Sequence, residues 1–216
     1  MTSSWLSVPL EDYEAHMRSE GVQQLPALAD LFKHSLGRCM PESLAGLGLA
    51  GGNGLEHIDS IITRRIVGVD INRTYLDAVQ RRFEAIPGME FCCCDLRRSD
   101  LRLDPVALVH AALIFEHTGL DRALDNALSL VAPGGKLSVV LQLPGESGQA
   151  VPGTGYVSMQ RLEQDFALVD VNEFRCLLAT RQFHLTEQVR RMVPAGKALW
   201  LGIFARSQQD LSAEAR

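Results

Sequence analysis

The chain lacks a long hydrophobic run. No stretch reaches the roughly 20 apolar residues that a membrane-spanning helix requires. Residues 1–10 also lack the basic cluster and the apolar segment of a secretory signal. We therefore expect a cytoplasmic protein with no membrane partner.

A basic block is missing as well. Lys and Arg total 21 against 26 Asp and Glu, which gives a net charge of −5 at pH 7, and arginines cluster only in pairs such as Arg64-Arg65. A protein that neutralises many phosphates needs a basic face, because binding releases counterions from the nucleic acid. The charge pattern therefore predicts no nucleic-acid partner and favours a small-molecule or protein substrate.

Residues with metal-ligand spacing are also lacking. Three of the five cysteines, Cys92, Cys93 and Cys94, stand in tandem. Successive side chains of a strand point to opposite faces, so these three thiols cannot converge on one metal ion. We expect buried free thiols and no metal site.

The composition that remains is that of a globular α/β protein. A chain of 216 residues fits one domain, and its aromatic content is only 6%. Leu, Ala and Val dominate the apolar residues, which suits a parallel sheet covered on both faces. No internal repeat or linker is visible.

Periodicity and turn residues predict alternating helices and strands. The expected helices cover residues 10–17, 25–36, a segment from about 55, 72–85, 121–131 and 171–180. The expected strands cover residues 43–47, 66–70, 89–95, 106–112, 136–143, 184–193 and 198–205. The last two are joined too tightly for a crossover, so we expect them to be antiparallel. Residues 144–155, rich in Gly and Pro, are interpreted as a mobile lid.

The segment from residue 44 to 70 is the most informative. It reads as a strand, a glycine-rich loop, a short helix and a second strand that ends at Asp70. Glycines let backbone N–H groups approach a ligand closely, and a carboxylate can accept both ribose hydroxyls. These features predict a site for an adenosine-containing cofactor. Gly46, Gly48 and Gly51 also satisfy the G-x-G-x-x-G spacing of dinucleotide sites.

Three later features favour one family. Asp95 closes the third strand, Pro133-Gly134-Gly135 precedes a strongly apolar strand, and Pro194-Ala195-Gly196 separates the last two strands. With these features the chain resembles the class I S-adenosylmethionine-dependent methyltransferases over residues 41–206. The resemblance implies a three-layer α-β-α fold whose seven-stranded sheet is mostly parallel and ends in an antiparallel hairpin. It also implies an N-terminal helical cover at residues 1–40 and an S-adenosylmethionine-binding domain at residues 41–216.

The glycine loop departs from the pattern of this family, in which an acidic residue ends the first strand and Gly-x-Gly-x-Gly follows. The corresponding residues here are Gly46, Gly48, Ala50 and Gly52. The acidic residue, which helps to hold the amino group of the cofactor, and the middle glycine are thus missing. The methyl group of Ala50 fits where the backbone keeps φ negative. Asn53 or Glu56 is expected to supply the missing polar contact.

The resemblance also assigns roles to two aspartates. Asp70 is expected to accept both ribose hydroxyls through charge-assisted hydrogen bonds, with a helix N-cap as the alternative role. Asp95 is expected to accept from the adenine amine, with Cys94 and Leu96 beside the ring. The full expected cofactor set is Gly48, Ala50, Gly52, Asn53, Asp70, Ile71, Cys94, Asp95, Leu96 and Ala111.

Candidate catalytic residues follow the fourth strand. Methyl transfer needs an aligned nucleophile and a dry site, and a base only for poorly acidic acceptors. His117 can take a proton near neutral pH, and Glu116 can orient it or bind a cationic acceptor; polar residues at a strand-to-helix junction are the alternative. His110 is expected to be a buried, hydrogen-bonded core histidine. Tyr13 and His16 are candidates for substrate binding from the N-terminal helix, with simple packing as the alternative.

The acceptor is narrowed by motifs that are absent. The chain has neither the Asn-Pro-Pro-Tyr type of stretch of nucleic-acid amino methyltransferases, nor the Pro-Cys pair of cytosine C5 enzymes, nor the paired-glutamate loop of protein arginine methyltransferases. A small-molecule acceptor, methylated on oxygen, nitrogen or carbon, is therefore favoured. Two other functions stay open: an inactive S-adenosylmethionine-binding regulatory protein, and a nicotinamide-dependent oxidoreductase. A homodimer also stays open.

Overall fold

The computed structural model describes residues 3–98, 101–145, 155–194 and 196–207. Their centre is a seven-stranded sheet of order β3-β2-β1-β4-β5-β7-β6. The strands are β1 (Ser43–Leu47), β2 (Arg65–Asp70), β3 (Met89–Cys93), β4 (Val106–Ala112), β5 (Val131–Leu143), β6 (Phe183–Met192) and β7 (Ala198–Arg206). Strands β1 to β5 pair in parallel, whereas β7 is antiparallel to both β5 and β6. The predicted fold class and terminal hairpin are confirmed.

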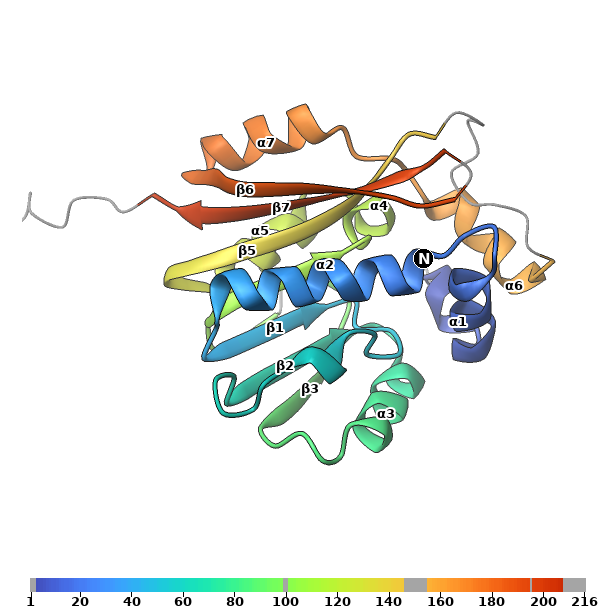
Figure 1. Ribbon diagram of the computed structural model, residues 1–216, viewed down its shortest axis with the longest axis horizontal. Helices are drawn as coiled ribbons and strands as arrows, with labels where there is room; N and C mark the ends of the chain where they lie inside the picture. The colour runs from blue at the N-terminus through green and yellow to red at the C-terminus, as the bar shows by residue number, and fades with distance from the viewer. Residues whose placement is uncertain (1–2, 99–100, 146–154, 195, 208–216) are drawn as a thin grey trace, which may run out of the picture.

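Helices cover both faces of this sheet (Figure 1). The α-helices are α1 (Leu10–Arg18), α2 (Gln24–Cys39), α3 (Arg73–Arg82), α4 (Phe115–Thr118), α5 (Arg122–Ser129), α6 (Val157–Gln160) and α7 (Val171–Thr180). The 3₁₀ segments are η1 (Ser4–Ser7), η2 (Leu55–His57) and η3 (Arg161–Asp165). No helix within the described ranges is both long and apolar enough to cross a membrane.

Strand alternation assigns each apolar residue to one of two cores. Leu44 of β1 packs with Phe32 of α2, while Ala45 and Leu47 pack on the opposite face, where Phe174 of α7 is buried. Helices α2 and α3 thus form one outer layer, and α5 and α7 form the other. Helix α2 therefore belongs to a layer of the domain, whereas the residues before it lie at the ends of the strands.

Two predicted elements were wrong in their extent. The expected helix from residue 55 is only the three-residue η2, because Gly52 and Gly54 adopt positive φ and few helix-forming residues separate them from β2. Strand β5 begins at Val131, five residues before its expected start, because Val131 pairs with Val106 across a register shift. The predicted lid at residues 144–155 lies mostly outside the described ranges.

His110 occupies the position that the sequence predicted. Its Nδ1 lies 3.0 Å from Ser138 Oγ, which in turn lies 2.8 Å from Ser35 Oγ of α2. Burial lowers the pKa of His110 to about 4, so the ring is neutral at physiological pH. The expectation of a buried, hydrogen-bonded core histidine is confirmed.

Gly88 provides a test of the backbone at the start of β3. It has a φ of +74°, and a Cβ there would lie 2.1 Å from the carbonyl oxygen of Arg64. Gly134 has the same φ but nothing within 4 Å of its Cβ position. We expect Gly134→Ala to lower the free energy of unfolding by about 1 kcal/mol, and Gly88→Ala by on the order of 3 kcal/mol. Denaturant unfolding measures both losses, and equal losses would contradict the close approach.

Candidate active site

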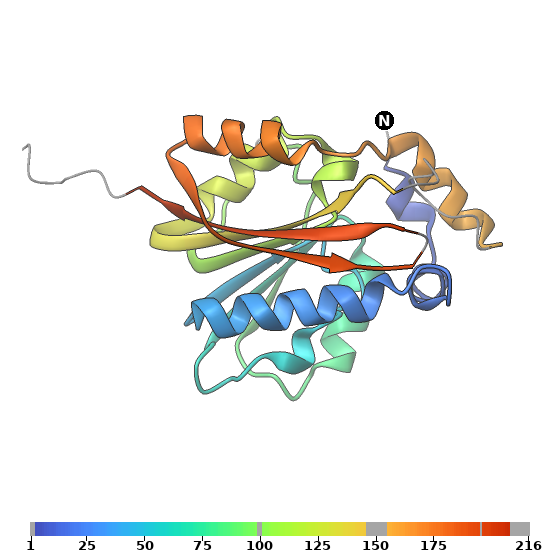
Figure 2. The ribbon, with the colours of Figure 1, turned by 45° about the horizontal axis from the view of Figure 1, so that its top comes forward.

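A cavity lies where the parallel strands end. Its lining comes from the glycine loop, the carboxyl ends of β2 and β4, the segment after β3, and a roof made of η1, α1, α6 and η3. It holds about 1080 Å³ free of protein atoms, a volume that includes the open space at its mouth. Figure 2 shows α1 and α6 side by side over this edge of the sheet. Open α/β sheets bind their ligands at this edge.

The glycine loop wraps against the end of β2. Gly48 N donates to Val69 O at 2.9 Å, and a Cβ on Gly48 would lie 2.7 Å from Ile114 Cδ1. The positive φ of Gly48, +68°, also favours a glycine there. Ala50 has a φ of +45°, so the expectation of negative φ at this residue was wrong. Its left-handed conformation allows Ala50 N to donate to Asp70 Oδ2 at 2.9 Å.

The side chain of Leu49 lies beside Gly46, the position at which the family pattern has an acidic residue. The side chain of Leu49 lies 2.9 Å from the position that a Cβ on Gly46 would take, and 2.6 Å from that of Gly68 on the neighbouring strand. An acidic side chain at position 46 would require the end of the Leu49 side chain to move. The two neighbouring glycines thus accommodate an apolar side chain where the family pattern has a carboxylate.

Asp70 is buried and joins two segments. Besides Ala50 N, it accepts from Asn72 N at 2.8 Å through Oδ1. Burial raises the pKa of Asp70, and the hydrogen bonds from these backbone N–H groups oppose that rise. The N-cap of α3 is Asn72, whose side chain accepts from Thr74 N, so the alternative role of Asp70 as the cap was wrong.

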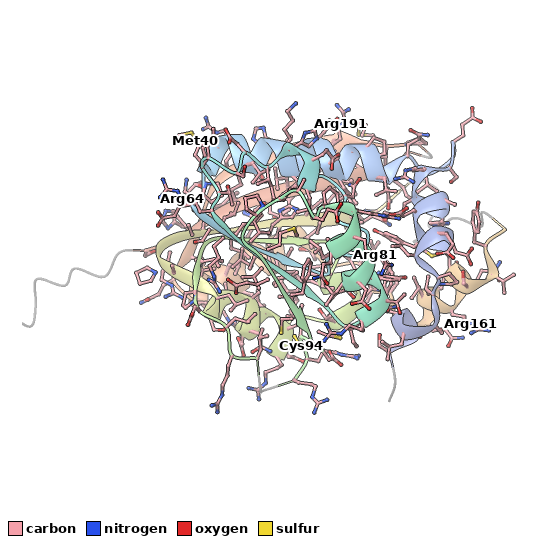
Figure 3. All side chains as sticks on the ribbon, turned by 90° about the horizontal axis from the view of Figure 1, so that it is seen from below. Met40, Arg64, Arg81, Cys94, Arg161 and Arg191 are labelled. Atoms are coloured by element: carbon pink, nitrogen blue, oxygen red, sulfur yellow. The ribbon has the colours of Figure 1, made fainter. Side chains whose placement is uncertain are left out.

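Cys94, Asp95 and Leu96 line the cavity beyond β3. Cys94, labelled in Figure 3, directly follows the last residue of this strand. The Asp95 carboxylate pairs with Arg97 at 2.7 Å, and this hydrogen bond lowers the pKa of Asp95. The thiols near this end are free but partly exposed, which corrects the expectation of burial. Cys92 and Cys94 share a face, with their sulfur atoms 3.5 Å apart.

Four expected site residues are absent from the lining. Asn53 Nδ2 donates to Leu25 O of α2, so its amide is directed to the helix layer. A Cβ on Gly52 would meet Phe83, and Ala111 is fully buried in the core. Strand alternation places the neighbour of Ala111, Ala112, in the cavity instead. Glu56 accepts from Gly54 N within its own loop.

Glu116, the fourth of these, lies behind the cavity wall. It is buried, and its Oε1 accepts from Gln142 N at 2.8 Å, whereas its Oε2 has no hydrogen-bond partner in the described structure. Burial raises the pKa of Glu116 to about 7. Gln142 does line the cavity and accepts a hydrogen bond from Gln24 of α2.

The roof is fastened to the domain by hydrogen bonds. Tyr75 of α3 donates to Val8 O at 2.8 Å, and Asn72 Nδ2 donates to Trp5 O at 3.1 Å. Ser4 Oγ donates to Asp165 of η3 at 2.5 Å, which ties the two parts of the roof together. The N-terminal residues therefore close the cavity in a defined position.

Expected substrate residues Tyr13 and His16 both line the cavity. Burial and the nearby Asp70 raise the pKa of Tyr13, so its hydroxyl stays protonated. Burial lowers the pKa of His16, and Lys197 lowers it further. Helix α1 thus brings two uncharged polar side chains to the cavity.

His117 is enclosed by aromatic rings. Trp5 and Phe166 contact it edge-on, with ring centroids at 5.0 and 5.1 Å. Burial lowers the pKa of His117 to about 4, an effect that Asp165 partly opposes. Both His117 Nδ1 and Trp5 Nε1 are buried without a hydrogen-bond partner among the described residues. All three rings line the cavity.

The sequence analysis missed Trp5, Phe166, Gln24 and Gln142. A weak signal existed for Trp5, because it is one of only two tryptophans in the sequence. Phe166 and the glutamines gave no such signal, since their role depends on segments that fold together from distant parts of the chain.

Known proteins resemble this arrangement. The family model described as "Methyltransferase domain" matches residues 46–135. These residues include the glycine loop, Asp70, the segment after β3, and His117. This segment of the chain is therefore similar to methyltransferase domains. No curated protein sequence matches the chain.

Solved structures share the fold of this chain. N-methyltransferase NodS from Bradyrhizobium japonicum WM9, solved with S-adenosyl-L-homocysteine, is 15% identical with a TM-score of 0.66, over 92% of this chain and 98% of that one. Magnesium protoporphyrin IX methyltransferase ChlM from Synechocystis PCC 6803 is 12% identical with a TM-score of 0.62, over 86% and 82%. The [4+2]-cyclase SpnF is 12% identical with a TM-score of 0.67, over 89% and 84%.

The raised pKa of Glu116 predicts how stability depends on pH. From about pH 4.5 to 7 the unfolded chain releases this proton while the native state keeps it, so the wild type loses stability as pH rises. We expect Glu116→Gln, which stays neutral, to exceed the wild type in free energy of unfolding by up to about 3 kcal/mol above pH 7, and to match it near pH 4.

Denaturant unfolding at the two pH values measures this difference. The exposed Glu20 provides a control, because Glu20→Gln makes the same chemical change on the surface. A Glu116→Gln difference that does not grow with pH would contradict the buried, protonated carboxyl group.

Proposed function

We propose that this protein binds S-adenosylmethionine and methylates a small-molecule acceptor. The observation that carries this proposal is the bonding of Asp70. Its oxygens accept from Ala50 N and Asn72 N, and the backbone N–H of Ile71 also stabilises the charged form. Because the two oxygens of a carboxylate offer about four acceptor sites, acceptor capacity remains for a ligand. A buried carboxylate of this kind suits the vicinal hydroxyls of a ribose.

The neighbouring residues fit the rest of an adenosine. Ile71, Cys94 and Leu96 offer an apolar surface for a purine ring, next to the Asp95 carboxylate as acceptor for its amine. Gly48 lets the loop backbone approach the ligand. When bound, the cofactor supplies an electrophilic methyl group on a sulfonium.

The acceptor end of the cavity would be formed by the roof and by His117. Aromatic and methionine side chains from η1, α1, α6 and η3 exclude water, which favours transfer to the acceptor over side reactions. His117 is neutral at physiological pH and can receive a proton. In this proposal residues 1–40 contribute the cover, through η1 and α1, to the domain formed by residues 41–216.

A nicotinamide-dependent oxidoreductase fits less well. Such enzymes place a diphosphate at the N-terminus of a helix that follows the glycine loop. Here the loop leads into the single turn η2, which carries no helix dipole of useful length. The terminal antiparallel hairpin also differs from a sheet continued by parallel strands.

Binding of S-adenosylhomocysteine tests the proposal. We expect Asp70→Asn to weaken this binding by at least about tenfold, because two charge-assisted hydrogen bonds are lost. Isothermal titration measures the change, and Asp77→Asn, which alters a carboxylate of α3 outside the lining, provides the matched control. If the wild type binds NADH but not S-adenosylhomocysteine, or if both variants bind equally, the assignment is wrong.

The departure at Gly46 predicts an unusual ligand preference. 5′-Methylthioadenosine lacks the amino-acid tail that the family's acidic residue helps to hold. Since Leu49 occupies that place, we expect the two ligands to differ in affinity by less than about tenfold. Titration with both ligands measures the ratio. A hundredfold preference for S-adenosylhomocysteine would indicate another strong partner for the tail.

A further inference from the structure

One end of the cavity has aromatic walls. Trp5 from η1 and Phe166, just after η3, contact the His117 ring edge-on, and Tyr13 of α1 contacts Trp5 at a centroid distance of 5.6 Å. Met159 and Leu162 of the roof also line the cavity. Rings and thioethers of this kind favour a flat, apolar guest.

Two polar atoms interrupt this apolar wall. Trp5 Nε1 and His117 Nδ1 are buried and have no hydrogen-bond partner among the described residues. Buried polar groups in native proteins are nearly always paired, so each unpaired atom requires an explanation. Because both residues line the cavity, a ligand is the natural partner for both atoms.

The chemistry of the two atoms restricts that ligand. The indole nitrogen only donates, whereas one nitrogen of a neutral imidazole accepts. A single group that accepts from Trp5 and donates to His117 is a hydroxyl. A protonated amine cannot accept from the indole.

Charge around His117 argues against a carboxylate. Asp165 of η3 acts on His117 electrostatically. Among the described residues that line the cavity, Arg97 is charged at neutral pH, and it is paired with Asp95. An anionic guest beside His117 would therefore meet the acidic Asp165, and the lining arginine is already paired.

We infer that the methyl acceptor is an aromatic compound that carries a hydroxyl, bound with its ring between Trp5, Phe166 and Tyr13. This inference rests on the proposed function. The Trp5 N–H donates to the hydroxyl oxygen, and the hydroxyl donates to His117 Nδ1. When the O–H bond breaks, the proton forms an N–H bond at Nδ1 and the electron pair stays on the oxygen, which becomes the nucleophile. Trp5 thus orients the acceptor, and His117 acts as the base.

The test uses three probes with the same ring: 4-methylphenol, 4-methylbenzoate and 4-methylbenzylamine. They are titrated into the full chain by calorimetry, with and without S-adenosylhomocysteine. We expect 4-methylphenol to bind at least about tenfold more tightly than the other two. Tighter binding of the benzoate or the benzylamine, or no binding of the phenol in either condition, would overturn the inference.

A pair of matched variants assigns the binding to the indole nitrogen. Trp5→Phe keeps a flat ring but removes the N–H, and we expect it to weaken the binding of 4-methylphenol by about threefold to tenfold. Trp200→Phe makes the same change at an indole that donates to Gln188, outside the cavity, and leaves phenol binding unchanged. Equal effects of the two substitutions would contradict the role of Trp5.

The control variant also supplies a direct reporter. The chain has two tryptophans, so in Trp200→Phe the fluorescence comes from Trp5 alone. We expect 4-methylphenol to change this fluorescence with the dissociation constant that calorimetry gives; an unchanged signal would mean that the probe binds elsewhere.

Failure of the inference can be told apart from failure of the proposed function. Loss of S-adenosylhomocysteine binding, measured without any probe, concerns the cofactor assignment alone. If the cofactor analogue binds and the phenol does not, the proposed function stands and the acceptor class is wrong.

Discussion

The hydrogen bonds of the Asp70 carboxylate are the constraint on which the site depends. One oxygen accepts from Ala50 in the glycine loop, and the other accepts from Asn72 at the start of α3. Asn72 in turn holds the carbonyl of Trp5 in the roof. A buried carboxylate is costly unless it is paired, so loop, helix and roof share one anchor whose position is set by the end of β2.

The order of the elements could be predicted because each depends on local sequence. Alternating apolar residues and turn formers gave the strands, and the tight final connection gave the antiparallel pair. The start of β5 could not be predicted, because Val131 becomes a strand residue only by pairing with Val106. The helix expected after the glycine loop is only a short turn for a local reason, because Gly52 and Gly54 have positive φ.

Part of the site could also be predicted, because the strand ends that form it were predicted. The carboxyl ends of parallel strands meet at one edge, so Asp70 and Asp95 were expected near the glycine loop, and both line the cavity. The direction of each side chain was harder to predict. Successive residues of β4 point to opposite faces of the sheet, so Ala111 lies in the core while its neighbour Ala112 lines the cavity. Trp5 gave only a weak signal, because its contact with His117 joins residues that are far apart in the sequence.

Burial shifts the pKa values of Glu116 and His117, two adjacent residues after β4, in opposite directions. It lowers the pKa of His117 to about 4 and raises that of Glu116 to about 7, because it disfavours the charged form of each. At neutral pH the end of the cavity around His117 therefore carries little charge, whereas the acidic Asp70 lies at the end near the glycine loop. A hydroxyl enters such an end without the desolvation of a full charge, while a carboxylate or an ammonium cannot. In the proposed site, the burial that keeps His117 neutral leaves its ring able to accept a hydrogen bond and disfavours a charged acceptor beside it.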